Sequence, residues 1–241
     1  MNSAIKSISS RKHWDLFYKR NADRFFKDRH WTTREFEDLA SSAGCDVTER
    51  RILLEVGCGA GNFIFPLLSE HSQEEMFIYA CDFSPRAVQL VRDHPNYDET
   101  RMKAFEADIT EGDLDAKLQN EKVNLVSLVF VLSAIKPEAF LKTVKNISKV
   151  MAVNGILLFR DYAVNDMAMV RFAPGTKIAD RHYLRQDGTT SYFFMAEEVR
   201  AMATDAGLTT RKLEYVHRRT VNKKEQLDVG RTFLQGIFVK T

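Results

Sequence analysis

The stretch ILLEVGCGAGN, residues 52–62, is an apolar run that ends in three glycines at alternate positions. The run predicts a buried strand, and the glycines predict a sharp turn whose bare backbone lies against a ligand. Helical spacing follows from residue 62, so the turn opens a helix. Backbone N–H groups at a helix start favour an anionic group, and the loop is therefore a candidate binding site.

Short apolar runs alternate with amphipathic stretches beyond this loop. The alternation predicts an α/β, Rossmann-like fold with a mostly parallel sheet covered on both faces. The predicted strands are 51–56, 76–82, 101–106, 123–131 and 155–161, and the predicted helices are 13–20, 34–39, 62–69, 85–93, 113–117, 138–150 and 196–206. A polar, basic loop region is expected over 164–192. Two late strands, near 213–219 and 231–239, predict an antiparallel hairpin that finishes the sheet.

The composition bounds the class of protein. A chain of 241 residues suffices for one α/β domain with a small appendage. No apolar run approaches the roughly 20 residues that span a bilayer, and the first residues lack the apolar core of a secretory signal. Three cysteines without metal-ligand spacing indicate a reducing compartment and no metal site. We expect a cytoplasmic protein, with the nucleus as an alternative; the acid-poor start up to Asp15 gives only weak support for mitochondria.

The net charge of +2 conceals an asymmetry along the chain. Residues 1–36 carry +5 and residues 205–241 carry +4, whereas the centre carries −7. Two interpretations stay open at this point. The basic ends are either solvated faces or a phosphate-binding rim around a site that the centre builds.

Three acids around the glycine loop indicate the kind of ligand. Asp82 ends the second predicted strand, where an acid binds ribose hydroxyls in dinucleotide sites. The spacing G-x-G-x-G differs from the G-x-G-x-x-G of those sites, and Glu55, two residues before the first glycine, disfavours a pyrophosphate. Asp108 follows the third strand. The pattern E-x-G-x-G-x-G with two later acids resembles class I S-adenosylmethionine-dependent methyltransferases.

That resemblance implies a cofactor and its contacts. The cofactor is S-adenosyl-L-methionine and the product S-adenosyl-L-homocysteine, with the second acid on the ribose and the third beside the adenine amino group. The residues expected to bind it from the sheet are Glu55, Gly57, Gly59, Gly61, Asp82, Phe83, Asp108, Ile109 and Val129.

Two features after the fourth and fifth strands bear on the substrate. An N-P-P-Y-like tetrapeptide, which orients exocyclic amines in amine methyltransferases, is absent after the fourth strand, where the chain reads VFVLSA. The fifth strand ends in Arg160-Asp161-Tyr162. A charged pair at the carboxyl end of a central parallel strand is expected to face the cleft, although a plain salt bridge at a strand end is the alternative.

Eight motifs in order make the resemblance specific. These are HWDLFYKRN (13–21), FFKDRHW (25–31), LLEVGCGAGN (53–62), ACDFSPRAV (80–88), FVLSAI (130–135), FRDY (159–162), RQDGTTSYFF (185–194) and VNKKEQL (221–227). Together they resemble the eukaryotic tRNA 3-methylcytidine methyltransferases over about residues 11–240. One departure is AVNG at 152–155 in place of K-P-G-G, which alters only a turn. The chain begins close to its first motif, which leaves open a longer natural N-terminus.

The chemistry of cytosine gives the catalytic candidates their roles. N3 carries an in-plane lone pair and no proton, so no base is needed, and the product is cationic. Asp161 is expected to accept from the exocyclic amine, while Arg160 either donates to O2 or holds Asp161. Tyr162 or Phe130 is expected to stack on the base. Because N3 is paired in a duplex, the target is flipped or lies in a loop, such as a position-32-like cytidine of the anticodon stem-loop.

The N-terminal segment is expected to be a cap. We predict a cap over residues 1–45 and a methyltransferase domain over 46–241. The resemblance places Trp14 and Tyr18 over the methionine end of the cofactor. Aromatic residues interleaved with cations suit RNA, so the predicted RNA contacts extend from the cap to the final hairpin. They are Arg24, Lys27, Arg29, His30, Arg185, Arg218, Arg219, Lys223 and Lys224.

The predicted partner is tRNA, with no membrane partner. Some members of the resembled family depend on seryl-tRNA synthetase, and such a helper is an open alternative here. Two rival functions also stay open. One is a small-molecule methyltransferase, and the other is a catalytically silent RNA-binding partner that retains the fold.

Overall fold

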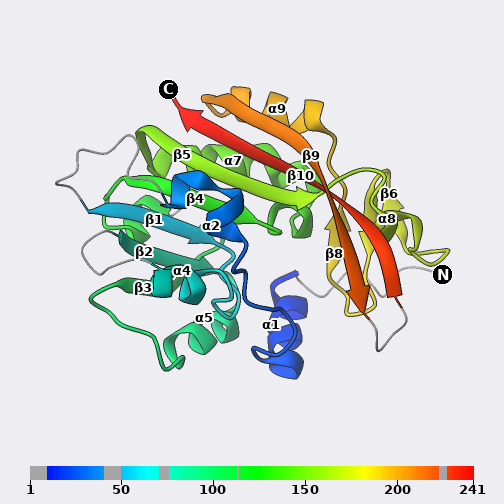
Figure 1. The fold of residues 1–241 in the computed structure, drawn as a ribbon, viewed down its shortest axis with the longest axis horizontal. Helices are drawn as coiled ribbons and strands as arrows, with labels where there is room; N and C mark the ends of the chain where they lie inside the picture. The colour runs from blue at the N-terminus through cyan, green and yellow to red at the C-terminus, as the bar shows by residue number, and fades with distance from the viewer. Residues whose placement is uncertain (1–9, 41–49, 71–75, 113, 223–226) are drawn as a thin grey trace.

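A central sheet organises the computed structural model, which describes residues 10–40, 50–70, 76–112, 114–222 and 227–241. Its seven strands lie in the order β3-β2-β1-β4-β5-β10-β9 (Figure 1). The first five strands are parallel and the last two are antiparallel, as the sequence predicts. The bounds are β1 Arg51–Val56, β2 Met76–Asp82, β3 Met102–Glu106, β4 Val123–Val129, β5 Met151–Tyr162, β9 Leu208–Asn222 and β10 Leu227–Lys240.

The order of the strands places the glycine loop at a switch point. Strand β1 pairs with β2 on one side and with β4 on the other, and the chain crosses from β3 to β4 between them. Crevices at such points lie outside the carboxyl ends of the strands, which is where ligands bind in open α/β sheets. The loop after β1 therefore opens directly into a crevice that the topology creates.

Helices cover the sheet as predicted, with small shifts at their ends. The helix after the glycine loop, α4, is Ile64–Glu70, and α5 is Pro85–Arg92 with a serine cap, since the Ser84 side chain accepts from Ala87 N–H. The predicted helix 138–150 begins as a 3-10 turn, Pro137–Ala139, and continues as α7, Phe140–Val150. The other bounds are α6 Leu114–Lys117, the 3-10 turn Leu132–Ala134 and α9 Ala196–Asp205.

The expected loop region 164–192 was wrong in part. It holds α8, Met167–Val170, and a small three-stranded sheet of β6 Lys177–Ala179, β7 His182–Leu184 and β8 Thr190–Tyr192. These strands have three residues each, too short for their hydrophobic alternation to be recognised in the sequence. Their pairing partners stabilise them instead. The predicted Asp-Gly turn is present, with Gly188 at a φ of +83°.

The cap comprises three helices, α1 Ser10–Asn21, α2 Thr32–Glu35 and α3 Glu37–Ala40. The predicted helix 34–39 is thus split, because Phe36 is extended with a ψ of 88°. In Figure 1, α2 lies across the sheet near β4 and β5, and α1 lies beside α5. The predicted boundary at 45/46 falls outside the described residues. None of the helices described is long and apolar enough to cross a membrane.

Candidate active site

Two adjoining hollows lie at the carboxyl ends of the parallel strands. The first hollow is lined by the ends of β2 and β3, including Asp82 and Asp108. The second hollow is lined by Glu55 of β1, by the end of β4 and by residues of the cap, β5 and β10. Trp14, Tyr18, Gly57, Phe130 and Ala134 line both hollows. The two spaces therefore meet along one shared wall.

The glycine loop contributes Gly57 to this wall, and Gly57 and Gly59 present bare backbone to the hollows. Gly57 and Gly59 have φ values of +67° and +54°, a conformation that side chains rarely adopt. A Cβ on Gly57 would lie 2.4 Å from a methyl of Val131, and a Cβ on Gly59 would lie 2.7 Å from the Tyr18 hydroxyl. A side chain at Gly59 would collide with the cap, and a side chain at Gly57 would collide with the loop after β4.

Gly61 differs from the other two glycines. It lines neither hollow, and a Cβ there would lie 2.3 Å from the Phe65 ring. Its φ of +86° and this close packing give it a structural reason to be glycine. Gly61 closes the turn, since its N–H donates to Cys58 O at 2.9 Å, and its contact with the cofactor stays a prediction.

Asp82 is held at the centre of the site by backbone groups. Its Oδ1 accepts from Ser84 N–H at 2.9 Å and its Oδ2 accepts from Gly59 N–H at 3.1 Å. Burial raises the pKa of Asp82 to about 6, although these hydrogen bonds oppose the shift. A carboxylate has about four lone-pair sites, so Asp82 keeps acceptor capacity for a ligand's hydroxyl group.

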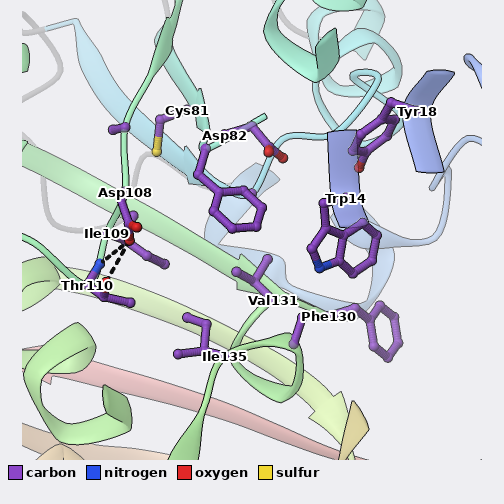
Figure 2. Close-up of a pocket in the computed structure, with 14 residues that line it drawn as sticks. Trp14, Tyr18, Cys81, Asp82, Asp108, Ile109, Thr110, Phe130, Val131 and Ile135 are labelled. Carbon is purple, nitrogen blue, oxygen red and sulfur yellow. Dashed lines mark hydrogen bonds between the residues drawn. The ribbon is translucent and has the colours of Figure 1, made fainter. Parts of the chain in front are cut away.

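Asp108 and Ile109 form the far end of the first hollow (Figure 2). The Asp108 Oδ1 accepts from both the N–H and the hydroxyl of Thr110, at 2.9 and 2.7 Å. The carboxylate is exposed, and both of these hydrogen bonds end on Oδ1. Together with apolar Phe83 and Ile135, this end suits a flat heterocycle with an amino group.

Glu55 presents an unusual buried group to the second hollow. Its side chain is 4% exposed, and its Oε2 has no hydrogen-bond partner among the described residues. Burial raises the pKa of Glu55 well above its usual value, and the charge of Arg29 opposes that shift. An unpaired buried carboxylate oxygen is costly, which indicates that a cationic ligand group completes it.

The cap closes the site from above. Trp14 and Tyr18 of α1 extend over the first hollow, opposite Asp108 and Ile109 (Figure 2). Asp15 fixes this helix by accepting from the Ser84 hydroxyl at 3.1 Å and from the guanidinium of Arg86 at 2.8 Å. Both rings line both hollows, and their place over the methionine end of the cofactor stays a prediction.

Aromatic rings and arginines line the open side of the second hollow. The Phe130 ring lies 5.1 Å from that of Tyr162 and 5.3 Å from that of Phe233. The guanidinium of Arg231 lies 5.6 Å from the Tyr162 ring, and that of Arg185 lies 5.4 Å from it. Rings beside cations form a place where a planar, electron-rich group can stack.

Arg231 and Phe233 are members of this group that the sequence analysis missed. The antiparallel register pairs Phe233 with Tyr162, which brings β10 beside the end of β5. Asp166 then fixes the Arg231 guanidinium with contacts of 2.8 to 3.1 Å. To find these two residues, one would need the register with which the predicted hairpin pairs with β5. The spacing of residues in the sequence does not give that register.

Arg29 requires a correction. We predicted an outward side chain for RNA phosphates, but its guanidinium points into the second hollow and donates to the carbonyl of Val129 at 3.2 Å. Its own N–H donates to Asn62 O at 2.8 Å, which turns this part of the cap inward. Loss of water lowers the pKa of Arg29, and Glu55 opposes this shift by its charge.

Arg160 and Asp161 lie behind the hollow, and neither lines it. Asp161 is fully buried, and its two oxygens accept from Tyr162 N–H at 2.8 Å and Ser133 N–H at 2.9 Å. Burial raises the pKa of Asp161 to about 6. Arg160 is 3% exposed and pairs with Glu35 of the cap. Tyr162 alone of the predicted catalytic group contacts the hollow, so direct roles for the other two stay predictions.

The remaining predicted RNA contacts differ in their surroundings. Arg24 and His30 are exposed, and Lys27 and Arg185 line the second hollow. Arg218 pairs with Glu35, and Arg219 pairs with Asp228. Lys223 and Lys224 lie outside the described residues. Among the residues described, no group of three or more His, Cys, Asp or Glu is placed to hold a metal ion.

Comparisons with known proteins identify relatives of this chain. A family model described as a methyltransferase domain matches residues 54–157. A Rattus norvegicus protein named "tRNA N(3)-cytidine methyltransferase METTL6" is 52% identical over 96% of this chain and 79% of its own length. A Saccharomyces cerevisiae protein named "tRNA(Thr) (cytosine(32)-N(3))-methyltransferase" is 35% identical over 94% of this chain and 36% of its own length.

A solved structure shares the fold. A SAM-dependent methyltransferase of Anabaena variabilis superposes with a TM-score of 0.71 at 11% identity, covering 97% of this chain and 96% of that one. The sheet order, the glycine loop and the acids at the carboxyl ends of β1, β2 and β3 define a class I S-adenosylmethionine-dependent methyltransferase. Given 52% identity to the rat protein over 96% of this chain, the chain belongs to the tRNA N(3)-cytidine methyltransferase family.

The residues of the site fit S-adenosyl-L-methionine. Asp82 has lone pairs for ribose hydroxyls, and Asp108 can accept from the adenine amino group. The orphaned Glu55 oxygen suits the ammonium group of the methionine part. The bare backbone at Gly57 and Gly59 leaves room for the chain between these ends. This fit rests on the donor and acceptor chemistry of the described side chains.

Proposed function

We propose that this protein methylates N3 of a cytidine in tRNA, with S-adenosyl-L-methionine as the methyl donor. The observation that carries the proposal is the group of Phe130, Tyr162 and Phe233, with Arg185 and Arg231, directly beside the hollow that fits the cofactor. Base–aromatic stacking contributes on the order of 1–3 kcal/mol per base. The names of the relatives support the same substrate atom.

The bound cofactor supplies an electrophilic sulfonium methyl group. The chain's own residues have to hold the base so that its N3 lone pair points at that methyl group, because N3 needs no deprotonation. Phe130 and Tyr162 fix the plane of the ring by stacking. Orientation of this kind accounts for much of the acceleration in reactions that need no acid or base.

Electrostatics beneath the base support the same chemistry. N3 methylation leaves the ring with a positive charge, and a fixed negative charge nearby stabilises the developing cation. Asp161 lies directly behind Tyr162 and, with a pKa of about 6, carries a negative charge at neutral pH. Its two backbone hydrogen bonds hold that charge in place. In this proposal Asp161 acts through its electrostatic field at the base and through the hydrogen bond that holds Tyr162 in position.

The substrate cytidine is proposed to lie in the anticodon stem-loop, at a position equivalent to 32. N3 is engaged in base pairing within a duplex, so an unpaired loop nucleotide enters the hollow at the lowest cost. The Saccharomyces relative is named for cytosine 32, which favours this position. In this proposal the phosphates around such a loop contact Arg24, Lys27 and His30 of the cap and Arg218 of β9, whose exposed side chains support this role.

Mass spectrometry of nucleosides provides the test. Purified protein and S-adenosyl-L-methionine are incubated with unmodified tRNA, and the digest is analysed for 3-methylcytidine. A matched reaction contains free cytidine in place of tRNA, and another contains tRNA with cytidine 32 replaced by uridine. We expect product only with the unchanged tRNA. Equal methylation of free cytidine would indicate a small-molecule methyltransferase, and RNA retention without product would indicate a silent binding partner.

A further inference from the structure

Glu35 of the cap forms ion pairs with two different strands of the sheet. One oxygen of its carboxylate pairs with Arg160 of β5, and the other lies 2.7 Å from a guanidinium nitrogen of Arg218 on β9. The Arg160 and Glu35 side chains are 4% and 13% exposed, whereas Arg218 is 49% exposed. The pair with Arg160 is therefore buried, and the pair with Arg218 forms its solvent-exposed edge.

Arg160 directs its remaining contacts toward the cap and the neighbouring strand. Its guanidinium lies 4.3 Å from the ring centre of Trp31 and 5.0 Å from that of Phe233. The same nitrogen that pairs with Glu35 donates to Gln235 Oε1 at 3.0 Å. The Gln235 amide in turn donates to the backbone carbonyl of Glu35 at 3.4 Å. These contacts join Arg160 to the cap and to β10, and two of the residues contacted, Trp31 and Phe233, line the second hollow.

A short, hydrogen-bonded stretch of backbone connects Glu35 to Arg29. Helix α2 begins three residues after Arg29, and the Thr32 hydroxyl donates to the Arg29 carbonyl at 2.9 Å. At the other end, Glu35 N–H donates to Trp31 O at 3.0 Å. The segment is compact, so a displacement of Glu35 is transmitted to Arg29 and Trp31, which both line the second hollow.

The energetics of buried charges make this connection strong. Removing one partner of a buried ion pair leaves an uncompensated charge, which is strongly destabilising. Burial disfavours the Glu35 carboxylate, but the hydrogen bonds and charges of Arg218 and Arg160 outweigh burial and lower the pKa of Glu35. The carboxylate is thus charged at neutral pH, and the cap and the sheet depend on each other at this point.

We propose that Glu35 and Arg160 form a latch that docks the cap segment 29–36 on the sheet and thereby positions Arg29 and Trp31 in the second hollow. Glu35 and Arg160 are positioning residues in this proposal, which rests on the proposed function. Arg160 acts through Glu35 and not on the base, which differs from the direct role that its place in the sequence suggests.

Tryptophan fluorescence measures the docking directly. The chain has two tryptophans, Trp14 and Trp31, and both belong to the cap, so quenching by acrylamide reports on the cap alone. The variants are Glu35→Gln and Arg160→Lys, each close in size to the original residue. The control is Glu37→Gln, an exposed glutamate two residues further along the same segment. Each variant is first checked by circular dichroism and thermal unfolding.

We expect both latch variants to increase quenching and to lower kcat/KM for tRNA about tenfold, while Glu37→Gln matches the wild type. Affinity for S-adenosyl-L-homocysteine should change less than threefold, because α1 has its own contacts with Ser84 and Arg86. The double variant should lose no more activity than the worse single variant, since residues that act as one unit are not additive.

The opposite pattern overturns the latch. If Arg160→Lys abolishes turnover while Glu35→Gln behaves as Glu37→Gln in both quenching and turnover, Arg160 acts on the substrate by itself. Should an Arg160 variant fail to fold, Glu35→Gln alone decides the question. The quenching experiment contains no RNA and no methyl donor, so a wild-type protein that fails to methylate tRNA would refute the proposed function and leave this measurement valid.

Discussion

The first hollow takes its acids from the ends of two neighbouring strands: Asp82 is the last residue of β2, and Asp108 lies two residues after the end of β3. The second hollow takes Arg29 from the cap, Phe130 from the loop after β4, Tyr162 from β5, and Arg231 and Phe233 from β10. One site is thus a property of a local strand-turn-helix pattern repeated along a parallel sheet. The other exists only where four distant segments meet. Asp82 of the first hollow and Tyr162 of the second should accordingly affect different measurable properties.

The largest expected effect tests the first hollow. If Asp82 accepts from two ribose hydroxyls, each charge-assisted hydrogen bond contributes about 1.5–3 kcal/mol. Asp82→Ala should then weaken S-adenosyl-L-homocysteine binding by about a hundredfold or more, because about 1.4 kcal/mol is a tenfold change. Isothermal titration calorimetry measures the affinity, and tRNA affinity is measured beside it. Equal losses of both affinities would show that the two hollows are not separable.

The second hollow gives the converse prediction. Tyr162→Ala should lower kcat/KM for tRNA by at least tenfold, since it removes a stacking ring worth on the order of 1–3 kcal/mol. Tyr162→Phe keeps the ring and should retain most of the activity. Cofactor affinity should stay within about twofold in both variants. A large loss with Tyr162→Phe would instead assign the function to the hydroxyl group.

A pH profile sharpens the role of Asp82. Its pKa of about 6 lies above the ordinary value of an aspartate, so the free protein takes up a proton there as the pH falls through 6. The protonated carboxyl no longer accepts both ribose hydroxyls, and cofactor affinity should fall about tenfold per pH unit below 6. The same raised pKa favours the folded state at low pH, and this contribution to stability is lost as the pH rises through 6. Asp82→Asn should give a flatter affinity profile; an unchanged profile would assign the titration to another group.

The smallest effect compares two arginines of the cap. Arg24 is exposed, whereas the Arg29 guanidinium points into the second hollow. If Arg24 contacts a phosphate, Arg24→Gln should reduce the slope of log affinity for tRNA against log salt by about 0.7–0.9. Arg29→Gln should lower turnover and leave that slope unchanged. Filter-binding isotherms at several salt concentrations measure both, and equal slope changes would return Arg29 to the phosphate-binding surface.

Much of the first hollow could be predicted from the sequence because its causes are local. An apolar run, alternate glycines and an acid at the end of the next strand each follow from backbone sterics and from the parallel arrangement. The strands 51–56 and 76–82 have the predicted bounds. Gly61 shows the limit of this reasoning: only the packing of Phe65 reveals that its missing side chain makes room for the core.

The second hollow could be predicted only in part. The sequence shows that Phe130 and Tyr162 are aromatic residues after the fourth and fifth strands. It does not show that the Arg29 side chain points inward or that β10 pairs beside the end of β5. A side chain's direction depends on which backbone groups its segment finds, here Asn62 O and Val129 O. Those partners lie far away in the sequence, and residue spacing within the cap contains no information about them.

The sequence by itself determined the parallel α/β sheet, the glycine loop, the acid at the end of each of the first strands and the family resemblance. Short-range rules suffice for these features, since turn geometry and strand burial act between near neighbours. Only the tertiary structure decided that Arg160 pairs with Glu35, that Arg29 points inward and that Phe233 faces Tyr162. Each of these contacts joins segments that are distant in the chain. Such contacts form only when the cap and the last strands pack on the sheet, because buried charges then need partners of opposite charge and buried rings need other side chains to pack against.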